Sequence, residues 1–274
     1  MATQNCLLPR VPSLCHTTRH VSAVTNQTRI PYPETADIAT SSDDYASRFA
    51  GPVGAWMLDT QTRLALDGLR RSPSPVHTVL DVGGGHGQLA GPLAAAGYAV
   101  TVIGSDACCA HRLAPLLTSG ACAFVTGNVI ALPFPDLAFD AVLSFRLLPH
   151  CAQWERLVGE LCRVARHTVV VDYPTRRSLN CVAPALFGAK QKLEGNTRTW
   201  RLFSDREVLN SFDSNGFSIT RRCGQFFLPM VLHRALRCRP LSQAAEAVSR
   251  ALGLNALFGS PVILTAQLRA EGRP

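Results

Sequence analysis

Apolar and polar positions in the middle of the chain follow two alternating patterns. Nearly continuous apolar runs predict strands that are covered on both faces of a parallel sheet, and they fall at residues 78–82, 99–104, 122–128, 139–145 and 167–173. Between these runs we expect helices near residues 87–96, 107–117 and 154–165, the last with an apolar face at Leu157, Leu161 and Val164. Strands that alternate with helices through short links predict a doubly wound α/β fold.

The pattern changes on both sides of this core. Residues 1–40 show no sustained periodicity and are expected to form a disordered arm. A helical pattern begins at Ser42, and the sequence GPVG at 51–54 divides it into two N-terminal helices. After Pro174 we expect helices at 183–193, 204–216 and 241–252 and strands at 217–223 and 260–270. We therefore assign residues 41–274 to one domain, with an insert at 224–259 before the last strand.

Composition and charge narrow the class of protein. The 274 residues are 47% hydrophobic and 17% charged, which is enough apolar material for a packed core. No apolar run approaches the roughly 18 residues that span a bilayer. The net charge of +8 is uneven, because residues 1–173 hold 12 Lys/Arg and 13 Asp/Glu whereas residues 174–274 hold 15 and 6. The basic end favours contact with an anionic substrate, a membrane surface or nucleic acid; otherwise it is a solvated basic surface.

The cysteines and the N-terminus bear on metal binding and location. The ten cysteines form no CxxC pair and no His/Cys cluster with zinc-site spacing, so we expect no metal site. Most of them lie in apolar stretches, which favours buried thiols in a reducing, cytoplasmic compartment. The acid-poor, Ser/Thr-rich N-terminus leaves an organellar transit peptide as the alternative.

The candidate site is the segment VLDVGGGHG at 79–87, where an acid and four glycines follow the first strand. Ligands of such sheets bind beyond the carboxyl ends of the strands, and glycine lets the backbone turn and approach them closely. Gly85, Gly87 and Ala90 also fit a weak dinucleotide pattern. Asp81, however, would repel a pyrophosphate and suits a ligand with an ammonium group. Asp106, at the end of the second strand, can accept from ribose hydroxyls in either case.

A third segment, GNVIALPFPDLAFDAV at 127–142, is more specific. Together with LDVGGGHG at 80–87 and GSD at 104–106, it resembles the class I S-adenosylmethionine (SAM)-dependent methyltransferases over residues 76–173. The resemblance is strongest to the small-molecule branch that includes the ubiquinone/menaquinone C-methyltransferases. It implies a Rossmann-like, mostly parallel seven-stranded sheet with an antiparallel last strand. It also implies a SAM-binding core at 76–173 and a basic substrate-side part at 174–274.

The resemblance further implies a set of cofactor-binding residues. The methionine part of SAM would be held by Asp81, Gly83, Gly84, Gly85 and Gly87. The ribose and adenine would be held by Asp106, with Ala107 beside it, and by Asn128 and the backbone of Val129, while Phe145 would lie beside the transferring methyl group. The family usually has Asp at the position of Asn128, but an amide oxygen can still accept from the adenine amino group.

Residues for catalysis and acceptor binding are less marked. His150 and Arg146 follow the fourth strand, and we consider His150 as a general base and Arg146 as a partner for an acidic acceptor; otherwise both are structural. Tyr45, Arg48 and Phe49 lie on the helix that closes over the cofactor in relatives, so they contact the acceptor or simply pack on the sheet. The fourth strand ends in SFRL rather than an N/D-P-P-Y motif, which disfavours a nucleic-acid acceptor.

The sequence therefore predicts methyl transfer from SAM to a small-molecule acceptor, whether phenolic, quinone-like or lipid. The alternative is a protein with this fold that binds without catalysing, as a membrane-docking or regulatory partner. Within the insert, GQFFLPMVLHRALRCRP at 224–240 interleaves apolar residues with Arg234, Arg237 and Arg239. This pattern suits peripheral contact with an anionic membrane, a lid over a hydrophobic acceptor, or a core helix with a basic outer face.

Overall fold

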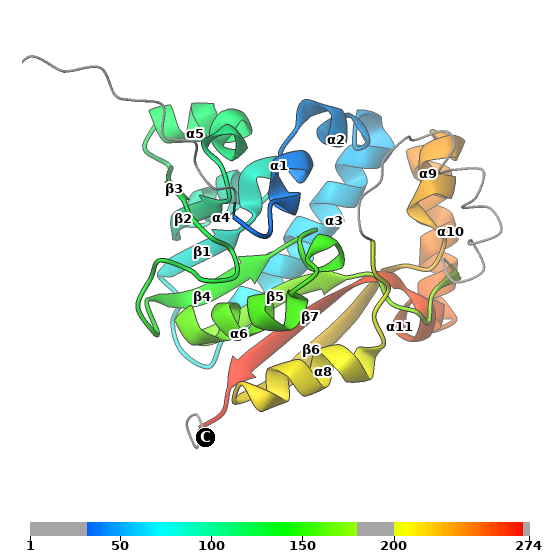
Figure 1. The fold of residues 1–274 in the computed structure, drawn as a ribbon. Helices are drawn as coiled ribbons and strands as arrows, with labels where there is room; N and C mark the ends of the chain where they lie inside the picture. Colours follow the sequence, from blue (N-terminus) through cyan, green and yellow to red (C-terminus); the bar gives the residue numbers. More distant parts are fainter. Residues whose placement is uncertain (1–31, 180–199, 271–274) are drawn as a thin grey trace, which may run out of the picture. The chain divides into compact units, whose positions relative to one another are not determined.

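A single seven-stranded sheet organises the computed structural model, which describes residues 32–179 and 200–270. The strand order is β3-β2-β1-β4-β5-β7-β6, and β7 runs antiparallel to both of its neighbours whereas the pairs from β3 to β5 are parallel (Figure 1). The strands are Thr78–Val82 (β1), Ala99–Gly104 (β2), Cys122–Thr126 (β3), Phe139–Ser144 (β4), Ala165–Tyr173 (β5), Phe217–Phe226 (β6) and Ser260–Leu268 (β7). The predicted Rossmann-like sheet, mostly parallel with an antiparallel last strand, is confirmed.

Helices cover both faces of this sheet, which explains why its strands lack alternation. Leu80 and Val82 face a layer that includes α6 (Trp154–Val164) and α8 (Asp205–Ser214). Val79 faces the opposite layer, with residues of α3 (Gly51–Arg70) and α4 (Ala90–Ala95). All three β1 side chains are fully buried, and such burial stabilises the fold by roughly 1.5–3 kcal/mol for each large apolar side chain. The predicted apolar face of α6 is likewise fully buried.

The start of α8 shows how local sequence fixes an element. The Ser204 hydroxyl accepts from the Glu207 backbone N–H at 3.3 Å, and the Glu207 carboxylate accepts from the Ser204 N–H at 2.8 Å. This reciprocal capping box satisfies two backbone donors that the first turn of a helix leaves unpaired. The helix ends just before Gly216, whose φ of +78° suits glycine. The predicted start at Ser204 and stop at Gly216 are confirmed.

The N-terminal part differs from the expectation in two ways. The predicted disordered arm includes α1 (Ala36–Thr40), where the fully buried Asp37 accepts from the Ser105 backbone N–H and hydroxyl at 2.6 and 2.5 Å. Because a buried carboxylate, rather than a face of apolar residues, holds this short helix in place, the hydrophobic periodicity of the sequence did not predict it. The two predicted N-terminal helices are present as α2 (Asp43–Ser47) and α3, but the break between them lies before the GPVG sequence, which begins α3 with Pro52 in the first turn.

The helices around the glycine loop are also shorter than predicted. The loop forms the 3₁₀ turn η1 (Gly84–His86), and α4 begins only at Ala90. The predicted helix at 107–117 is the 3₁₀ segment η2 (Ala107–Leu113) followed by α5 (Ala114–Thr118). Left-handed backbone at Gly83 and Gly87 is incompatible with a continuous α-helix. The predicted helix at 183–193 lies outside the described residues.

The insert between β6 and β7 is helical. It contains α9 (Met230–Leu236), α10 (Arg239–Ala251) and α11 (Leu254–Phe258), which gather at one side of the sheet (Figure 1). The helix predicted at 241–252 is therefore confirmed with a shift of its start. Among the described helices, none is both long and apolar enough to cross a membrane.

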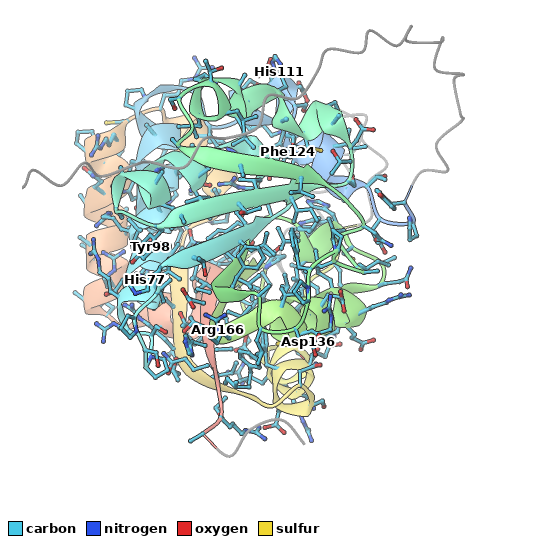
Figure 2. The ribbon with its side chains drawn as sticks, turned by 90° about the vertical axis from the view of Figure 1, so that its left-hand side faces the viewer. His77, Tyr98, His111, Phe124, Asp136 and Arg166 are labelled. Atoms are coloured by element: carbon cyan, nitrogen blue, oxygen red, sulfur yellow. The ribbon has the colours of Figure 1, made fainter. Side chains whose placement is uncertain are left out.

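At the end of the sheet away from the glycine loop, Asp140 joins β1, β4 and β5. Its Oδ2 accepts from the backbone N–H groups of His77 and Thr78 at 2.9 Å each, and its Oδ1 accepts from Arg166 at 2.6 Å. His77 and Arg166 are labelled at this end of the sheet in Figure 2. Although burial opposes ionisation, these hydrogen bonds lower the pKa of Asp140 to about 2. Asp140, the acid of the FDAV sequence, therefore has a structural role: it links the starts of β1, β4 and β5.

Candidate functional site

In the turn after β1 the backbone lies so close to neighbouring groups that a side chain would not fit. Gly83 and Gly87 have φ of +75° and +77°, a conformation that glycine adopts without strain. A Cβ at Gly84 would lie 2.1 Å from Oδ2 of Asp81, and one at Gly85 would lie 2.2 Å from the Ser41 hydroxyl. The loop therefore presses its backbone against the Asp81 carboxylate on one side and against the N-terminal segment on the other.

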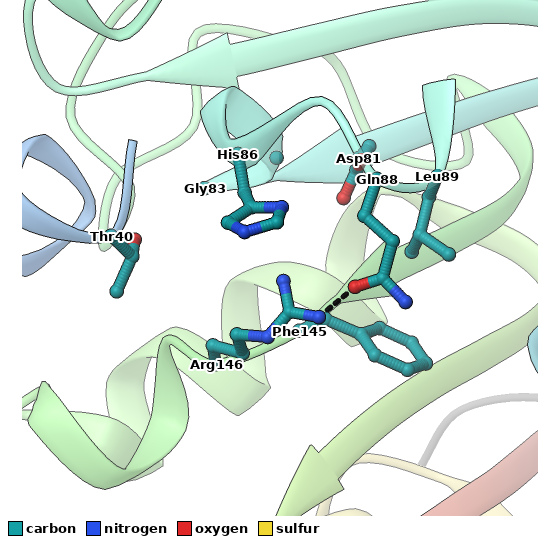
Figure 3. A pocket seen from close by; sticks show the side chains of 9 residues that line it. Thr40, Asp81, Gly83, His86, Gln88, Leu89, Phe145 and Arg146 are labelled. Carbon is teal, nitrogen blue, oxygen red and sulfur yellow. Dashed lines mark hydrogen bonds between the residues drawn. The ribbon is translucent and has the colours of Figure 1, made fainter. Parts of the chain in front are cut away.

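This loop, the end of β4 and the N-terminal segment enclose a pocket of about 260 Å³ that opens to solvent (Figure 3). Its lining consists of Thr40, Asp81, Gly83, Gly84, His86, Gln88, Leu89, Phe145 and Arg146.

Asp81 is the acidic group of the pocket. The residue is 1% exposed, and its Oδ1 has no hydrogen-bond partner in the described part of the chain. Burial raises the pKa of Asp81 to about 7, and the positive charge of Arg146 opposes that rise. A buried carboxylate oxygen without a donor is costly, so the site favours a cationic group that brings hydrogen-bond donors.

Arg146 is the basic group of the same pocket. Its backbone has φ of +62°, and its N–H donates to Oδ1 of Asp172 at 2.6 Å. Its Nη2 donates to Oε1 of Gln61 at 2.6 Å and to Oε1 of Gln88, the bond drawn in Figure 3. The guanidinium also lies 4.9 Å from the ring centre of Phe49. Its Nε has no partner among the described residues, so a donor is left for a ligand.

His86 was not predicted as a site residue. Its ring lies edge-on to Tyr45 and Phe49, with centroid distances of 5.9 and 5.7 Å, and neither ring nitrogen has a partner within the described ranges. Burial, together with the charges of Arg146 and Arg112, lowers the pKa of His86 to about 3. The imidazole is therefore neutral at pH 7 and a weak base.

The structure gathers some of the predicted residues in the pocket and leaves others outside its lining. Asp81, Gly83, Gly84, Phe145 and Arg146 line the pocket, and Gly85 and Gly87 complete its loop. Tyr45 and Phe49 flank His86, whereas Arg48 lies 5.2 Å over the Tyr45 ring. His150 ends the 3₁₀ turn η3 (Leu148–His150), is half-buried and does not line the pocket.

The remaining predicted residues follow the two neighbouring strands. Asp106 comes after β2, where its Oδ1 accepts from the Cys108 N–H at 2.8 Å and caps η2; Ala107 next to it is exposed. Asn128 comes after β3, where its Oδ1 accepts from the Ile130 N–H at 3.1 Å, and Val129 is fully buried. Since β3, β2 and β1 are adjacent and parallel, all these residues lie along one edge of the sheet.

Besides His86, the sequence analysis missed the lining residues Thr40, Gln88 and Leu89, and also Gln61, which accepts from Arg146 without lining the pocket. Gln88 lies directly after the glycine loop, so its position in the sequence was a usable signal. Gln61 and Thr40 come from α3 and α1, and nothing in their local sequence distinguishes them from surface amides and hydroxyls.

Comparison with known proteins finds methyltransferases. Residues 80–170 match the family described as methyltransferase domain. An uncharacterized methyltransferase of Mycolicibacterium gilvum is 42% identical over 89 residues, which cover 32% of this chain and 35% of that protein. The ubiquinone biosynthesis O-methyltransferase of Rhizobium etli is 27% identical over 182 residues, covering 63% and 69%. The chain thus spans about a third of the length of the Mycolicibacterium relatives that it matches.

Among solved structures, the magnesium protoporphyrin IX methyltransferase of Synechocystis, which has S-adenosylhomocysteine bound, has a TM-score of 0.58 with 16% identity. The alignment covers 85% of this chain and 98% of that one. The fold is therefore that of solved methyltransferase structures. Within it, residues 80–170 are the part that matches the methyltransferase-domain family.

Proposed function

We propose that this chain binds SAM along the carboxyl edge of β1, β2 and β3 and transfers its methyl group to a small-molecule acceptor. The observation that carries the proposal is the pairing of Asp81 with Arg146 across one small pocket. The methionine end of SAM bears an ammonium and a carboxylate. Asp81 would accept from the ammonium, and Arg146 would donate to the carboxylate, each through a charge-assisted hydrogen bond. A pyrophosphate offers Asp81 no donor.

Asp106 and Asn128 extend the proposed site along the sheet. Asp106, fixed by its bond to Cys108, follows β2 and would accept from the ribose hydroxyls. The Asn128 amide oxygen already accepts one bond from Ile130, and its second lone pair would accept from the adenine amino group. The strand order β1, β2, β3 then corresponds to methionine, ribose and adenine along the ligand.

SAM would supply an activated methyl group on a positively charged sulfur, and the chain would supply proximity and orientation. The buried Phe145 would close the pocket beside the methyl group. His86 would remain neutral and would not repel the sulfonium. Tyr45 and Phe49 would form an aromatic wall that suits a planar phenolic or quinone-like acceptor, with Arg48 over Tyr45 beside it. His150 is our candidate for a base that removes a proton from such an acceptor.

Calorimetric titration with SAM and S-adenosylhomocysteine, followed by transfer of radiolabelled methyl groups to a cell extract, tests this function. We expect binding of both ligands and label in one small-molecule fraction of the extract. Absence of binding at high micromolar ligand would overturn the proposal. Binding without transfer would favour the alternative, a protein of this fold that binds but does not catalyse. An Asp106→Ala variant with unchanged affinity would overturn the ribose assignment.

A further inference from the structure

The insert helix α10 has its polar side buried and its apolar side exposed. Its buried residues are Ser242, Glu246 and Ser249. Its large apolar side chains are exposed instead, Leu241 by 53%, Val248 by 61% and Leu252 by 68%. A helix on a globular protein normally turns its apolar stripe toward the core. The polarity of α10 is therefore inverted.

Hydrogen bonds, rather than apolar burial, hold α10 in this orientation. Glu246 accepts from the backbone N–H groups of Phe227 and Leu228 at 3.0 and 2.9 Å. Its carboxylate also accepts from Asn255 Nδ2 at 2.7 Å and lies 2.9 Å from Nε2 of His233. Rotation of the helix to bury Leu252 would break this buried network. The outward direction of the apolar residues is consequently built into the fold.

The neighbouring helices α9 and α11 also expose large apolar side chains. We call the insert face the exposed apolar residues of α9, α10 and α11, namely Val231, Leu232, Leu236, Leu241, Val248, Leu252, Leu257 and Phe258. In Figure 1 these three helices lie together at one side of the molecule. Single exposed apolar residues are ordinary, but a set this large on three adjacent helices marks an interaction surface.

The exposed charges of the insert itself have one sign. Residues 227–259, all of which the structure describes, contain Arg234, Arg237, Arg239 and Arg250, and their one acid, Glu246, is buried. Arg237, Arg239 and Arg250 are exposed. A symmetric contact between two copies would bring arginines against arginines, so the charge disfavours a second copy of this chain. Apolar side chains among exposed arginines match an anionic lipid surface.

We infer that the insert face docks this protein on an anionic lipid bilayer. The leucine, valine and phenylalanine side chains enter the boundary between headgroups and acyl chains, and the arginines contact lipid phosphates. The face is also connected to the pocket through packed side chains. Met230 of α9 and Phe49 both pack against a buried cluster that includes Trp56, and Phe49 lies against the Arg146 guanidinium. The inference stands on the insert alone and does not depend on methyl transfer.

Co-sedimentation of the full chain with vesicles tests the inference. The vesicles are phosphatidylcholine alone, or phosphatidylcholine mixed with phosphatidylglycerol. We expect sedimentation with the anionic vesicles only, and a decrease as salt is added. A Val248→Ser/Leu252→Ser variant should lose at least roughly tenfold in partitioning because it removes the apolar contacts. Neutralising Arg237, Arg239 and Arg250 to Gln should cost roughly fivefold for each arginine.

Matched controls separate docking from folding. Leu209→Ser changes an exposed leucine on α8, and Arg70→Gln changes an exposed arginine on α3; both should bind vesicles as the wild type does. All variants should melt within a few degrees of the wild type. Equal vesicle binding by the insert variants and the wild type would overturn the inference, as would a wild type that ignores anionic vesicles. A dimer in solution that Val248→Ser/Leu252→Ser dissociates, without vesicle binding, would identify a second copy as the occupant instead.

Discussion

The glycine-loop pocket and the insert each bury one carboxylate, and the two are treated in opposite ways. Asp81 and Glu246 are both 1% exposed. Asp81 has one oxygen without a donor among the described residues, and burial raises its pKa to about 7. For Glu246 burial also opposes ionisation, but hydrogen bonds from His233, Phe227, Leu228 and Asn255 hold its pKa below the usual value. A buried carboxylate whose oxygens all accept hydrogen bonds stabilises the fold. A buried carboxylate with too few hydrogen-bond donors around it indicates a ligand-binding site.

The largest test of this contrast is the stability of Glu246→Ala. The substitution leaves two backbone N–H groups and the side chains of His233 and Asn255 without their hydrogen-bond acceptor. We therefore expect a loss of about 3–5 kcal/mol in the free energy of unfolding. Chemical denaturation followed by circular dichroism measures it. Glu155→Ala, at an exposed position on α6, serves as the control and should change stability by less than about 0.5 kcal/mol. A Glu246→Ala variant as stable as this control would remove the structural role of the carboxylate.

Asp81→Asn should have the reverse profile. Stability should stay the same or rise, because the amide removes a buried charge that lacks a full set of partners. Affinity for S-adenosylhomocysteine should fall by about 100-fold, since a charge-assisted bond to the ligand ammonium is lost. Calorimetric titration measures the affinity, with the exposed Asp59→Asn as the control. Unchanged affinity in Asp81→Asn would contradict the ammonium assignment.

Arg146→Gln separates the two ends of the proposed ligand. Loss of the guanidinium should weaken binding of S-adenosylhomocysteine by roughly tenfold, a hydrogen bond to a charged group being worth about 1.5–3 kcal/mol. It should have little effect on an analogue that lacks the methionine carboxylate. The ratio of the two affinities, measured in wild type and variant, isolates the contact. An equal loss for both ligands would assign Arg146 to the fold of the pocket or to the acceptor.

The glycine-loop pocket could be predicted from the sequence more fully than the insert. Asp81 and the glycines were predictable because a strand, an acid and the turn are contiguous and their chemistry is local. Gln61 of α3 contacts Arg146 and Thr40 of α1 lines the pocket, so only the tertiary fold reveals their roles. For α10 the periodicity correctly predicted a helix. Periodicity shows that the apolar residues share one face of the helix, but it does not show whether that face meets the core or the solvent. Because glutamate is almost never fully buried unless paired, its sequence gave no reason to place Glu246 inside.

The smallest test uses pH, and the two carboxylates should respond with opposite signs. Between about pH 4 and 7 the folded state binds a proton at Asp81 that the unfolded state has released, so this group lowers stability as pH rises. The lowered pKa of Glu246 acts conversely: its contribution is present above its unfolded pKa and is lost as pH falls through the folded value. The difference in unfolding free energy between the wild type and Asp81→Asn, measured from pH 4 to 8, should therefore decline as pH rises.

Affinity for S-adenosylhomocysteine should rise over the same range, by up to tenfold per pH unit below 7, because the ammonium requires an ionised Asp81. In Asp81→Asn this pH dependence of affinity should disappear, and its persistence would place the titrating group elsewhere in the pocket.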